Sequence, residues 1–326
     1  MLVEIHAAGR SEILRTVSNR PALHVPSCPI ALPHAPSPRA ARRRTLARLA
    51  ALAAAAAVPR SAGAQSGSVA PYVPSPDGVV AEMLRMAEVG PTDFVIDLGS
   101  GDGRIVLTAA KVYGARGFGV EILDDLVAQS NESARNQGIA DRVKFVRQDL
   151  FQTDISPATV LTIYLLPETV NQLSDKLKTQ LRPGTRVLTH DYPIGGWLPE
   201  AHQRFDQQEK VKATGVASAT LYLYRVPARV GGRWLATLPP GVSRQRVTLE
   251  LRQQWQKVDG MARIDDREVP IDAVELRGEQ LSFRLPLARG RLAQFEGRVR
   301  DGRIAGTVAL AGGPGASGPW SAVPAR

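Results

Sequence analysis

The run Asp97-Leu98-Gly99-Ser100-Gly101-Asp102-Gly103 limits the possible folds of this 326-residue chain more than any other feature. It follows a short apolar stretch, Phe94-Val95-Ile96, that has the character of a buried strand, and it precedes an amphipathic stretch from Arg104 to Val112. Glycines at such a turn allow positive φ angles and let the backbone approach a ligand closely. The run therefore predicts a ligand-binding turn between a strand and a helix in an open α/β sheet.

Apolar runs and helical patterns alternate from residue 71 to residue 226. Ser75-Pro76-Asp77 predicts a capped helix whose apolar face carries Val79, Val80, Met83, Leu84 and Met86. The other expected elements are strands at 94–96, 117–120, 143–146, 158–165 and 186–189, helices at 104–112 and 124–137, and a late edge or hairpin strand at 220–224. Strands separated by helices of this length predict a doubly wound parallel sheet covered on both faces.

The pattern changes after Pro227. Val247, Leu249 and Leu251 alternate with polar residues, and turn signals recur at Asp259-Gly260, Asp265-Asp266, Arg277-Gly278 and Asp301-Gly302. Residues 227–326 are therefore expected to form a separate all-β domain, a small barrel or sandwich. Trp234 and Trp320, near its two ends, are expected in its core.

Three details distinguish the glycine run from a dinucleotide-binding turn. Its spacing is G-x-G-x-G, whereas G-x-G-x-x-G seats a pyrophosphate on the helix N-terminus. Asp97, two residues before the first glycine, would repel a diphosphate and attract an ammonium group. Glu121, at the end of the second predicted strand, is placed to accept hydrogen bonds from both hydroxyls of a ribose.

A third acidic residue follows the third predicted strand. Asp149 is placed to accept from an adenine amino group, while Leu150 and Phe151 pack on the ring. These groups together match the ammonium, the ribose diol and the adenine of S-adenosylmethionine. We therefore expect this cofactor to be bound by Asp97, Gly99, Ser100, Gly101, Gly103, Glu121, Asp149 and Leu150.

The chain resembles class I S-adenosylmethionine-dependent methyltransferases over residues 71–226. The resemblance is carried by Pro71-Tyr72-Val73-Pro74, the run VIDLGSGDGRIV, Gly119-Val120-Glu121 and Tyr164-Leu165-Leu166-Pro167. These motifs are similar to one branch, which includes the mitochondrial lysine methyltransferases of the ATP synthase c-subunit and of the adenine nucleotide carrier. The resemblance implies a seven-strand Rossmann-like sheet, N-methylation of a protein lysine, and cofactor contacts at Asp97, Gly99, Gly101, Glu121 and Asp149.

The methyl acceptor is expected beside the carboxyl ends of the fourth and fifth strands, because ligands of open α/β sheets bind there. The segments Tyr164 to Glu168 and His190-Asp191-Tyr192 follow these strands. Neutralising a lysine at pH 7 costs about 4–5 kcal/mol, so a nearby proton acceptor would lower the barrier. Tyr164, Glu168 and Asp191 are the candidate catalytic residues. Purely structural interpretations remain open for three residues of these segments. Tyr164 could belong to the sheet core, Glu168 could be an acid in the first turn of a helix, and His190 could be a loop residue.

Most of the positive charge lies in the first 64 residues. They contain nine arginines, no lysine and two glutamates, a net of +7, so only +3 of the total +10 remains for the rest of the chain. A nucleic-acid partner is therefore not expected. Residues 39–64 combine Arg42-Arg43-Arg44, an apolar run from Leu49 to Val58 and the small triplet Ala62-Gly63-Ala64, the pattern of a secretory signal peptide. The arginines also resemble a twin-arginine signal. A disordered Ala-rich tail and a mitochondrial presequence are the alternatives.

The segments on either side of this signal have different characters. Residues 1–38 are Pro-rich and fit no part of a signal peptide, so we expect a start assigned too far upstream. Residues 65–70 are a short polar linker. The only cysteine, Cys28, lies before the signal, so the chain after it has no thiol for a disulfide, a zinc site or a nucleophile, and no metal is expected.

Export conflicts with the supply of the cofactor, because S-adenosylmethionine is a cytoplasmic metabolite. The leader could tether an active enzyme to the inner face of a membrane, or the cofactor could be supplied outside. The third alternative is an exported, non-catalytic protein whose β-rich region binds a partner in the cell envelope. Within the enzyme class, the methyl acceptor is left open between a protein, membrane-associated or not, and a small molecule.

Overall fold

The computed structural model describes residues 72–206, 211, 215, 217–287, 290–311 and 316–325. The chain divides into two units, Met1–Gly67 and Ser68–Arg326, and the described residues all belong to the second. The predicted leader, the linker at 65–70, Pro71 and Cys28 lie outside the described residues. No helix in the described part of the chain is long and apolar enough to cross a membrane.

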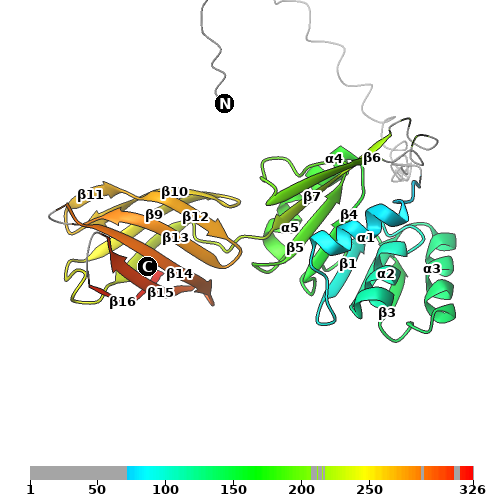
Figure 1. The fold of residues 1–326 in the computed structure, drawn as a ribbon, viewed down its shortest axis with the longest axis horizontal. Helices are drawn as coiled ribbons and strands as arrows, with labels where there is room; N and C mark the ends of the chain where they lie inside the picture. Colours follow the sequence, from blue (N-terminus) through cyan, green and yellow to red (C-terminus); the bar gives the residue numbers. More distant parts are fainter. Residues whose placement is uncertain are drawn as a thin grey trace, which may run out of the picture. The chain divides into compact units, whose positions relative to one another are not determined.

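Within the described residues, seven strands form a first sheet in the order β3-β2-β1-β4-β5-β7-β6 (Figure 1). The first five strands of this order run parallel, and β7 runs antiparallel to both β5 and β6. This is the Rossmann-like sheet that the sequence predicted. The strands are β1 (Phe94–Leu98), β2 (Arg116–Glu121), β3 (Val143–Arg147), β4 (Val160–Ile163), β5 (Arg186–His190), β6 (Ala201–Asp206) and β7 (Ser218–Arg225).

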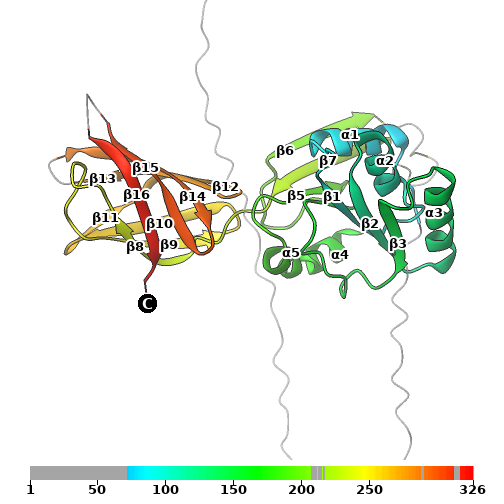
Figure 2. The ribbon, with the colours of Figure 1, turned by 90° about the horizontal axis from the view of Figure 1, so that it is seen from below.

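Helices cover both faces of this sheet, with α1 and α2 on the face opposite α4 and α5 (Figure 2). Side chains alternate between the faces of a strand, so neighbouring residues of β1 enter two separate cores. Val95 packs with α1, α2 and α3, whereas Ile96 packs with α4 and α5. The helices are α1 (Asp77–Met86), α2 (Arg104–Tyr113), α3 (Asp124–Asn136), α4 (Pro167–Gln172) and α5 (Ser174–Gln180).

The edge of the sheet is β6, so the interpretation of 220–224 as an edge strand is wrong. β7, which contains these residues, pairs with β5 on one side and with β6 on the other, and only its antiparallel pairing agrees with the hairpin alternative. The sequence did not predict β6 because none of its residues is buried. An edge strand that exposes both faces has no apolar alternation to reveal it.

The start of α1 also differs from the expectation. Pro76 occupies the N-cap position, and no side chain caps the helix. The hydroxyl of Ser75 instead lies 3.0 Å from Nδ1 of His190. The apparent capping signal is therefore a long-range contact, although the buried face of the helix, with Met83 and Leu84, is as predicted.

Within the described residues, nine strands form a second, antiparallel sheet in the order β11-β10-β9-β8-β16-β15-β14-β13-β12. Its two edge strands, β11 and β12, are consecutive and separated only by Ile271, so the sheet is nearly closed into a barrel. The strands are β8 (Gly232–Thr237), β9 (Val247–Gln254), β10 (Lys257–Ile264), β11 (Arg267–Pro270), β12 (Asp272–Arg277), β13 (Gln280–Pro286), β14 (Leu292–Arg300), β15 (Arg303–Leu310) and β16 (Ser317–Pro324).

Aromatic side chains fill the interior of this barrel. Phe283 and Phe295 stack with ring centroids 4.5 Å apart, and Trp320 meets both rings edge-on. Trp234 is also buried, and its indole N–H donates to the carbonyl of Val230. Both tryptophans are therefore part of the core, as the sequence predicted.

One of the predicted turns lies inside a strand. Asp259 and Gly260 belong to β10, and the chain turns instead at Trp255-Gln256. A Cβ at position 260 would collide with the carbonyl oxygen of Glu250 on β9. This glycine therefore marks a close approach of two strands rather than a turn.

Trp255 also links the two sheets. The residue is 7 % exposed, and its ring stacks on that of Trp197, which follows β5, with centroids 4.0 Å apart. Arg277 of β12 pairs with Glu200, which precedes β6, at 3.1 Å. Contacts therefore join the two regions on either side of Pro227.

Candidate active site

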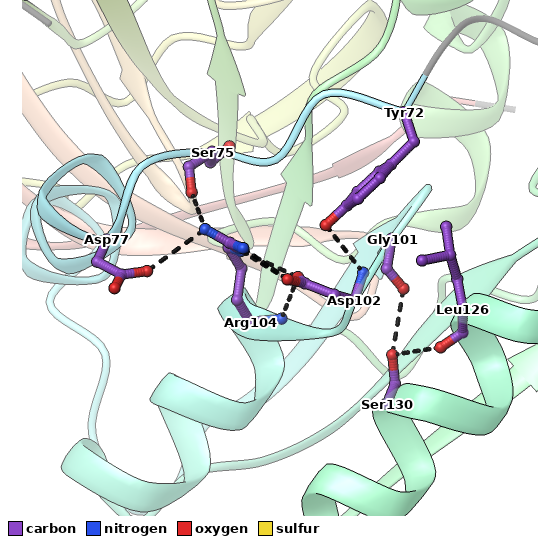
Figure 3. A network of polar contacts seen from close by, with 8 residues as sticks. All are labelled: Tyr72, Ser75, Asp77, Gly101, Asp102, Arg104, Leu126 and Ser130. Carbon is purple, nitrogen blue, oxygen red and sulfur yellow. Dashed lines mark hydrogen bonds and ion pairs between the residues drawn. The ribbon is translucent and has the colours of Figure 1, made fainter. Parts of the chain in front are cut away.

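The glycine run forms the loop between β1 and α2. Gly99, Gly101 and Gly103 have φ angles of 78°, 53° and 78°, in the left-handed region that favours glycine. A Cβ at position 101 would collide with the ring of Tyr72, so this position also requires glycine because there is no room for a side chain. Below the loop, the Ser130 hydroxyl donates to the carbonyl of Gly101 at 3.1 Å (Figure 3). The loop is therefore a tight turn that requires glycine, and Gly101 and Gly103 are buried in it.

Glu121 ends β2 beside this loop. Its carboxylate accepts from the backbone N–H of Gly101 at 3.0 Å and from that of Ile122 at 2.7 Å. The backbone N–H of Leu123 donates at 3.2 Å to the same oxygen, Oε1, as that of Ile122. The three bonds fix the carboxylate at the carboxyl edge of the sheet and leave an acceptor site on Oε2, the oxygen that Gly101 contacts. The position suits an acceptor of ribose hydroxyl hydrogen bonds.

Asp97 is 2 % exposed at the end of β1. Burial raises its pKa from 3.8 to about 7; a hydrogen bond from the Thr162 hydroxyl, at 2.7 Å, opposes the rise, and the negative charges of Glu121 and Asp102 add to it. A carboxylate that has lost its water is stabilised by a cation. Asp97 is therefore suited to the ammonium group of S-adenosylmethionine.

Arg104 connects the glycine loop to the N-terminal strap, which we define as residues 72–75 (Figure 3). Its guanidinium donates to the Asp102 carboxylate at 2.6 Å and to the Ser75 carbonyl at 2.8 Å. Burial alone would raise the pKa of Asp102, but the hydrogen bonds and charge of Arg104 outweigh it and lower that pKa. Tyr72, at the other end of the strap, lies over the loop, with its hydroxyl 3.4 Å from the backbone nitrogen of Asp102.

The remaining predicted cofactor residues lie in different surroundings. Asp149 is exposed after β3, and its carboxylate accepts from the backbone N–H of Phe151, whose ring is 42 % exposed. Leu150 is half-buried against the core beneath α4 and α5. The side chain of Ser100 packs against Gly119 of β2, so it lies under the loop rather than on its open side.

These residues fit S-adenosylmethionine. At position 101 the glycine leaves room for the ring of Tyr72, which lies against the loop. Asp97 would supply a buried acid for the ammonium, Glu121 an anchored acid for the ribose, and Phe151 an exposed ring for the adenine. In the described part of the chain, no group of three or more His, Cys, Asp or Glu side chains is arranged to hold a metal ion.

Tyr164, His190 and Asp191 meet where β4 and β5 end. Ile163 pairs with Thr189, which places the residues that follow them side by side. The ring of Tyr164 stacks on the imidazole of His190 with centroids 3.9 Å apart. Burial, the charge of Asp191 and a hydrogen bond to its carboxylate raise the pKa of Tyr164, so the phenol stays protonated and donates to Asp191.

Asp191 has an unusual backbone conformation, with φ at 65°. Two hydrogen bonds to Thr220 of β7 hold it: the Asp191 N–H donates to the Thr220 carbonyl at 2.7 Å, and the Thr220 N–H donates to the Asp191 carboxylate at 3.0 Å. A non-glycine residue in this region is strained and is kept there only by its surroundings. The strain directs attention to this carboxylate as a functional group.

Glu168 does not join this group. It is exposed in the first turn of α4, and no hydrogen bond or ion pair within residues 72–206 links it to Tyr164 or Asp191. Tyr192 is half-buried next to Asp191. The structure therefore brings together two of the three predicted catalytic residues, with His190 beside them.

Sequence reasoning missed the roles of Thr162 and Ser75. Thr162 is the one polar residue of the buried strand β4, Val160–Ile163. A single hydroxyl in an otherwise apolar strand could have indicated a buried polar partner. Ser75 carried a misleading signal, since a serine before a helix is an ordinary capping residue. Both contacts join strands or segments that are far apart in the sequence.

Residues 97–201 match the family model described as the ANTKMT methyltransferase domain. A protein-lysine N-methyltransferase of Saccharolobus islandicus is 41 % identical over 156 residues, 47 % of this chain and 92 % of that protein. The lysine N-methyltransferase of the ATP synthase c-subunit from Xenopus laevis is 35 % identical over 130 residues, 40 % of this chain and 57 % of that protein. The structure of an RNA methyltransferase from Salinibacter ruber with S-adenosyl-L-homocysteine is 44 % identical, covers 48 % of this chain and 96 % of its own, and has a TM-score of 0.43.

The matched region contains the glycine loop, Glu121, Asp149 and the group of Tyr164, His190 and Asp191. The predicted cofactor residues and the predicted catalytic residues thus fall within one type of domain. The chain belongs to the ANTKMT methyltransferase domain family and is a class I S-adenosylmethionine-dependent methyltransferase.

Proposed function

We propose that this methyltransferase modifies the ε-amino group of a lysine in a protein. The observation that carries the proposal is the Asp191 carboxylate, held by the Thr220 N–H and hydrogen-bonded by a protonated Tyr164 beside the carboxyl ends of β4 and β5. The similarity to a protein-lysine N-methyltransferase of Saccharolobus islandicus, matched over 92 % of its length, supports the same acceptor.

A lysine acceptor needs what this group of residues offers. At pH 7 the amine is protonated, and neutralising it costs about 4–5 kcal/mol. Asp191 attracts the ammonium and accepts its proton, while Tyr164 and the two bonds to Thr220 keep the carboxylate in place. Bound S-adenosylmethionine supplies an electrophilic methyl group on a sulfonium. The lysine amine, once neutral, would be the nucleophile for this methyl group, and the proton held on Asp191 would pass to solvent.

Radioactive methyl transfer from S-adenosylmethionine to a protein extract tests the proposal with the full chain. We expect label that protease removes, that nuclease leaves intact, and that acid hydrolysis releases as N-methylated lysine. Label in the nuclease-sensitive or small-molecule fraction instead would reject a protein acceptor.

Variants of the acceptor residues test the mechanism. Asp191→Asn should lower kcat by about 100-fold or more, and raising the pH should recover much of it, because more of the lysine is then neutral. Tyr164→Phe should lower kcat by about tenfold. Asp175→Asn, an exposed acid on α5, is the matched control and should leave the rate unchanged. A normal rate in Asp191→Asn would remove its role as proton acceptor.

We also propose that the leader directs the chain to the cell envelope and is cleaved before Gln65. The arginines at 42–44, the apolar run and the small triplet at 62–64 support this location. N-terminal sequencing of the native protein should find Gln65 or a neighbouring residue in at least part of the molecules. A full-length cytoplasmic product would exclude export and would remove the conflict with cofactor supply.

A further inference from the structure

We call Tyr164, His190 and Asp191 the acceptor group, because the methyl acceptor is proposed to bind beside them. His190 is the member of this group that the proposed mechanism does not use. Its imidazole is buried at the end of β5, with 1 % of the residue exposed, and Ser75, at 4 %, lies against it. The Ser75 hydroxyl is 3.0 Å from Nδ1 of His190, a contact between residues 115 positions apart. The N-terminal strap is thus held against the carboxyl end of β5.

The orientation of this imidazole bears on both acceptor residues. Tyr164 stacks on the ring at 3.9 Å with an interplanar angle of 26°. The other ring nitrogen, Nε2, lies 3.7 Å from Oδ1 of Asp191. A rotated or displaced imidazole ring would therefore move the Tyr164 phenol and the Asp191 carboxylate, which act on the lysine amine in the proposed mechanism.

Ser75 is also tied to the glycine loop, through its backbone. Its carbonyl accepts from Arg104 at 2.8 Å, and Arg104 holds Asp102 of the loop (Figure 3). Arg104 is itself the first residue of α2, directly after Gly103. A single residue is therefore connected to the loop by its carbonyl, through Arg104, and to His190 by its hydroxyl.

We propose that Ser75 is a positioning residue for methyl transfer. Its hydroxyl fixes the His190 ring, and thereby Tyr164 and Asp191, in register with the glycine loop that Arg104 ties to the strap. The proposal rests on the proposed function only in assigning Tyr164 and Asp191 to the methyl acceptor. A structural contact alone would stabilise the fold without affecting the chemical step, so the two roles can be separated by experiment.

Nuclear magnetic resonance of ¹⁵N-histidine-labelled full-length protein tests the link directly. Of the five histidines, His6, His24 and His34 lie in the first 38 residues, which leaves His190 and His202 in the methyltransferase region. We expect S-adenosylhomocysteine to shift the His190 ring signals in the wild type. Ser75→Ala should change the Nδ1 signal of His190 and weaken this response, while His202 serves as the internal reference.

Kinetics provide the second readout. Ser75→Ala should lower kcat by about tenfold and change the Kd of S-adenosylhomocysteine by no more than about twofold, and Ser75→Thr should restore most of the rate. The matched control is Thr185→Val, which removes a buried hydroxyl bond to the Ala158 carbonyl at the other end of β5. It should lower stability without lowering kcat.

The outcomes separate this proposal from the proposed function. Unchanged His190 signals in Ser75→Ala, an unchanged kcat, or an equal loss of kcat in Thr185→Val would each overturn the positioning role. If the wild type methylates an acceptor other than a protein lysine, the proposed function fails, and kcat for that acceptor becomes the readout for Ser75.

Discussion

Asp97 and Asp102 lie in the same loop, and their pKa values shift in opposite directions. Asp97 is enclosed, with no cationic partner among the residues that the structure describes, so burial raises its pKa to about 7. Asp102 is also partly buried, yet Arg104 lowers its pKa. Asp97 is therefore suited to bind a cationic ligand, whereas Asp102 already pairs with Arg104 and ties the loop to the strap.

We expect Asp97→Asn to stabilise the cofactor-free protein in a pH-dependent way. An acid whose pKa rises from 3.8 to about 7 on folding destabilises the fold increasingly as pH rises through this range, and the penalty is complete above it. The substitution should therefore raise the free energy of unfolding by about 4 kcal/mol near pH 8 and by less than about 1 kcal/mol near pH 4. Urea unfolding at both pH values measures the difference.

The same substitution should weaken S-adenosylmethionine binding. In the wild type, affinity should rise with pH through about 7, because only the ionised Asp97 attracts the ammonium. Asp97→Asn should lose this pH dependence. An equal gain in stability at both pH values would show that Asp97 is not a buried, uncompensated acid.

Calorimetry on the glycine loop checks the cofactor site. Gly101→Val should abolish S-adenosylmethionine binding, because its φ of 53° strains a side chain and the added atoms collide with Tyr72. Glu121→Ala should weaken binding about tenfold to a hundredfold, the value of a charged hydrogen bond. Gly138→Val has a similar φ of 69° but nothing within 4 Å of its Cβ, so it controls for backbone strain. Binding of NADH in place of S-adenosylmethionine would contradict the site.

Among the elements, the segment that carries Asp191 is anchored by β7. Tyr224 of β7 is fully buried, its hydroxyl accepts from the backbone N–H of Ile194 at 2.9 Å, and its ring packs against Trp197. Thr220 of the same strand holds Asp191 itself. The antiparallel strand β7 therefore holds the segment that carries the proposed catalytic residue Asp191, although β7 follows this segment in sequence.

Tyr224→Phe should loosen this segment. The change keeps the ring and leaves the Ile194 N–H without its acceptor, which should cost about 1–3 kcal/mol of stability. Faster amide hydrogen exchange over residues 191–197 should accompany the loss, together with a lower kcat. Tyr113→Phe, at the end of α2, removes a hydroxyl elsewhere and should leave exchange in this segment unchanged. Protection of residues 191–197 equal to that of the wild type would contradict the anchoring role.

At the scale of the whole molecule, we propose a domain boundary at 226/227, with the barrel serving to recruit a partner in the cell envelope. All of the predicted cofactor-binding and catalytic residues lie before Val226. The barrel has its own core, which includes Phe283, Phe295 and Trp320. The stacking of Trp255 on Trp197 nevertheless crosses the boundary, so the two regions are coupled.

Truncation after Val226 tests this division. Residues 65–226 should still bind S-adenosylmethionine with nearly the wild-type Kd, but they should melt at a lower temperature because Trp197 loses its cover, and they should methylate the native target poorly. Trp255→Ala in the full chain should reproduce the loss of stability without the loss of targeting. Aggregation or loss of cofactor binding would mean that the two regions share a core, and full activity on the native target would remove the targeting role.

The sequence by itself determined the sheet, the glycine loop and the cofactor class. These rest on short-range properties: an apolar strand, alternating glycines and acids at strand ends that lie within about 50 residues of one another. The barrel was likewise readable from the alternation of strands and turns. The edge strand β6 was not, because its exposed residues leave no apolar period.

Only the tertiary structure decided how the site is held together. The contacts of Ser75 with His190 and of Thr162 with Asp97 span 115 and 65 residues, and the stacking of Trp197 on Trp255 joins two sheets. A single hydrogen bond or ring contact at such separation leaves no periodic trace in the sequence. Tyr164 and Asp191 were distinguished from Glu168 for the same reason, since all three follow strands and only the packing of β4, β5 and β7 brings two of them together.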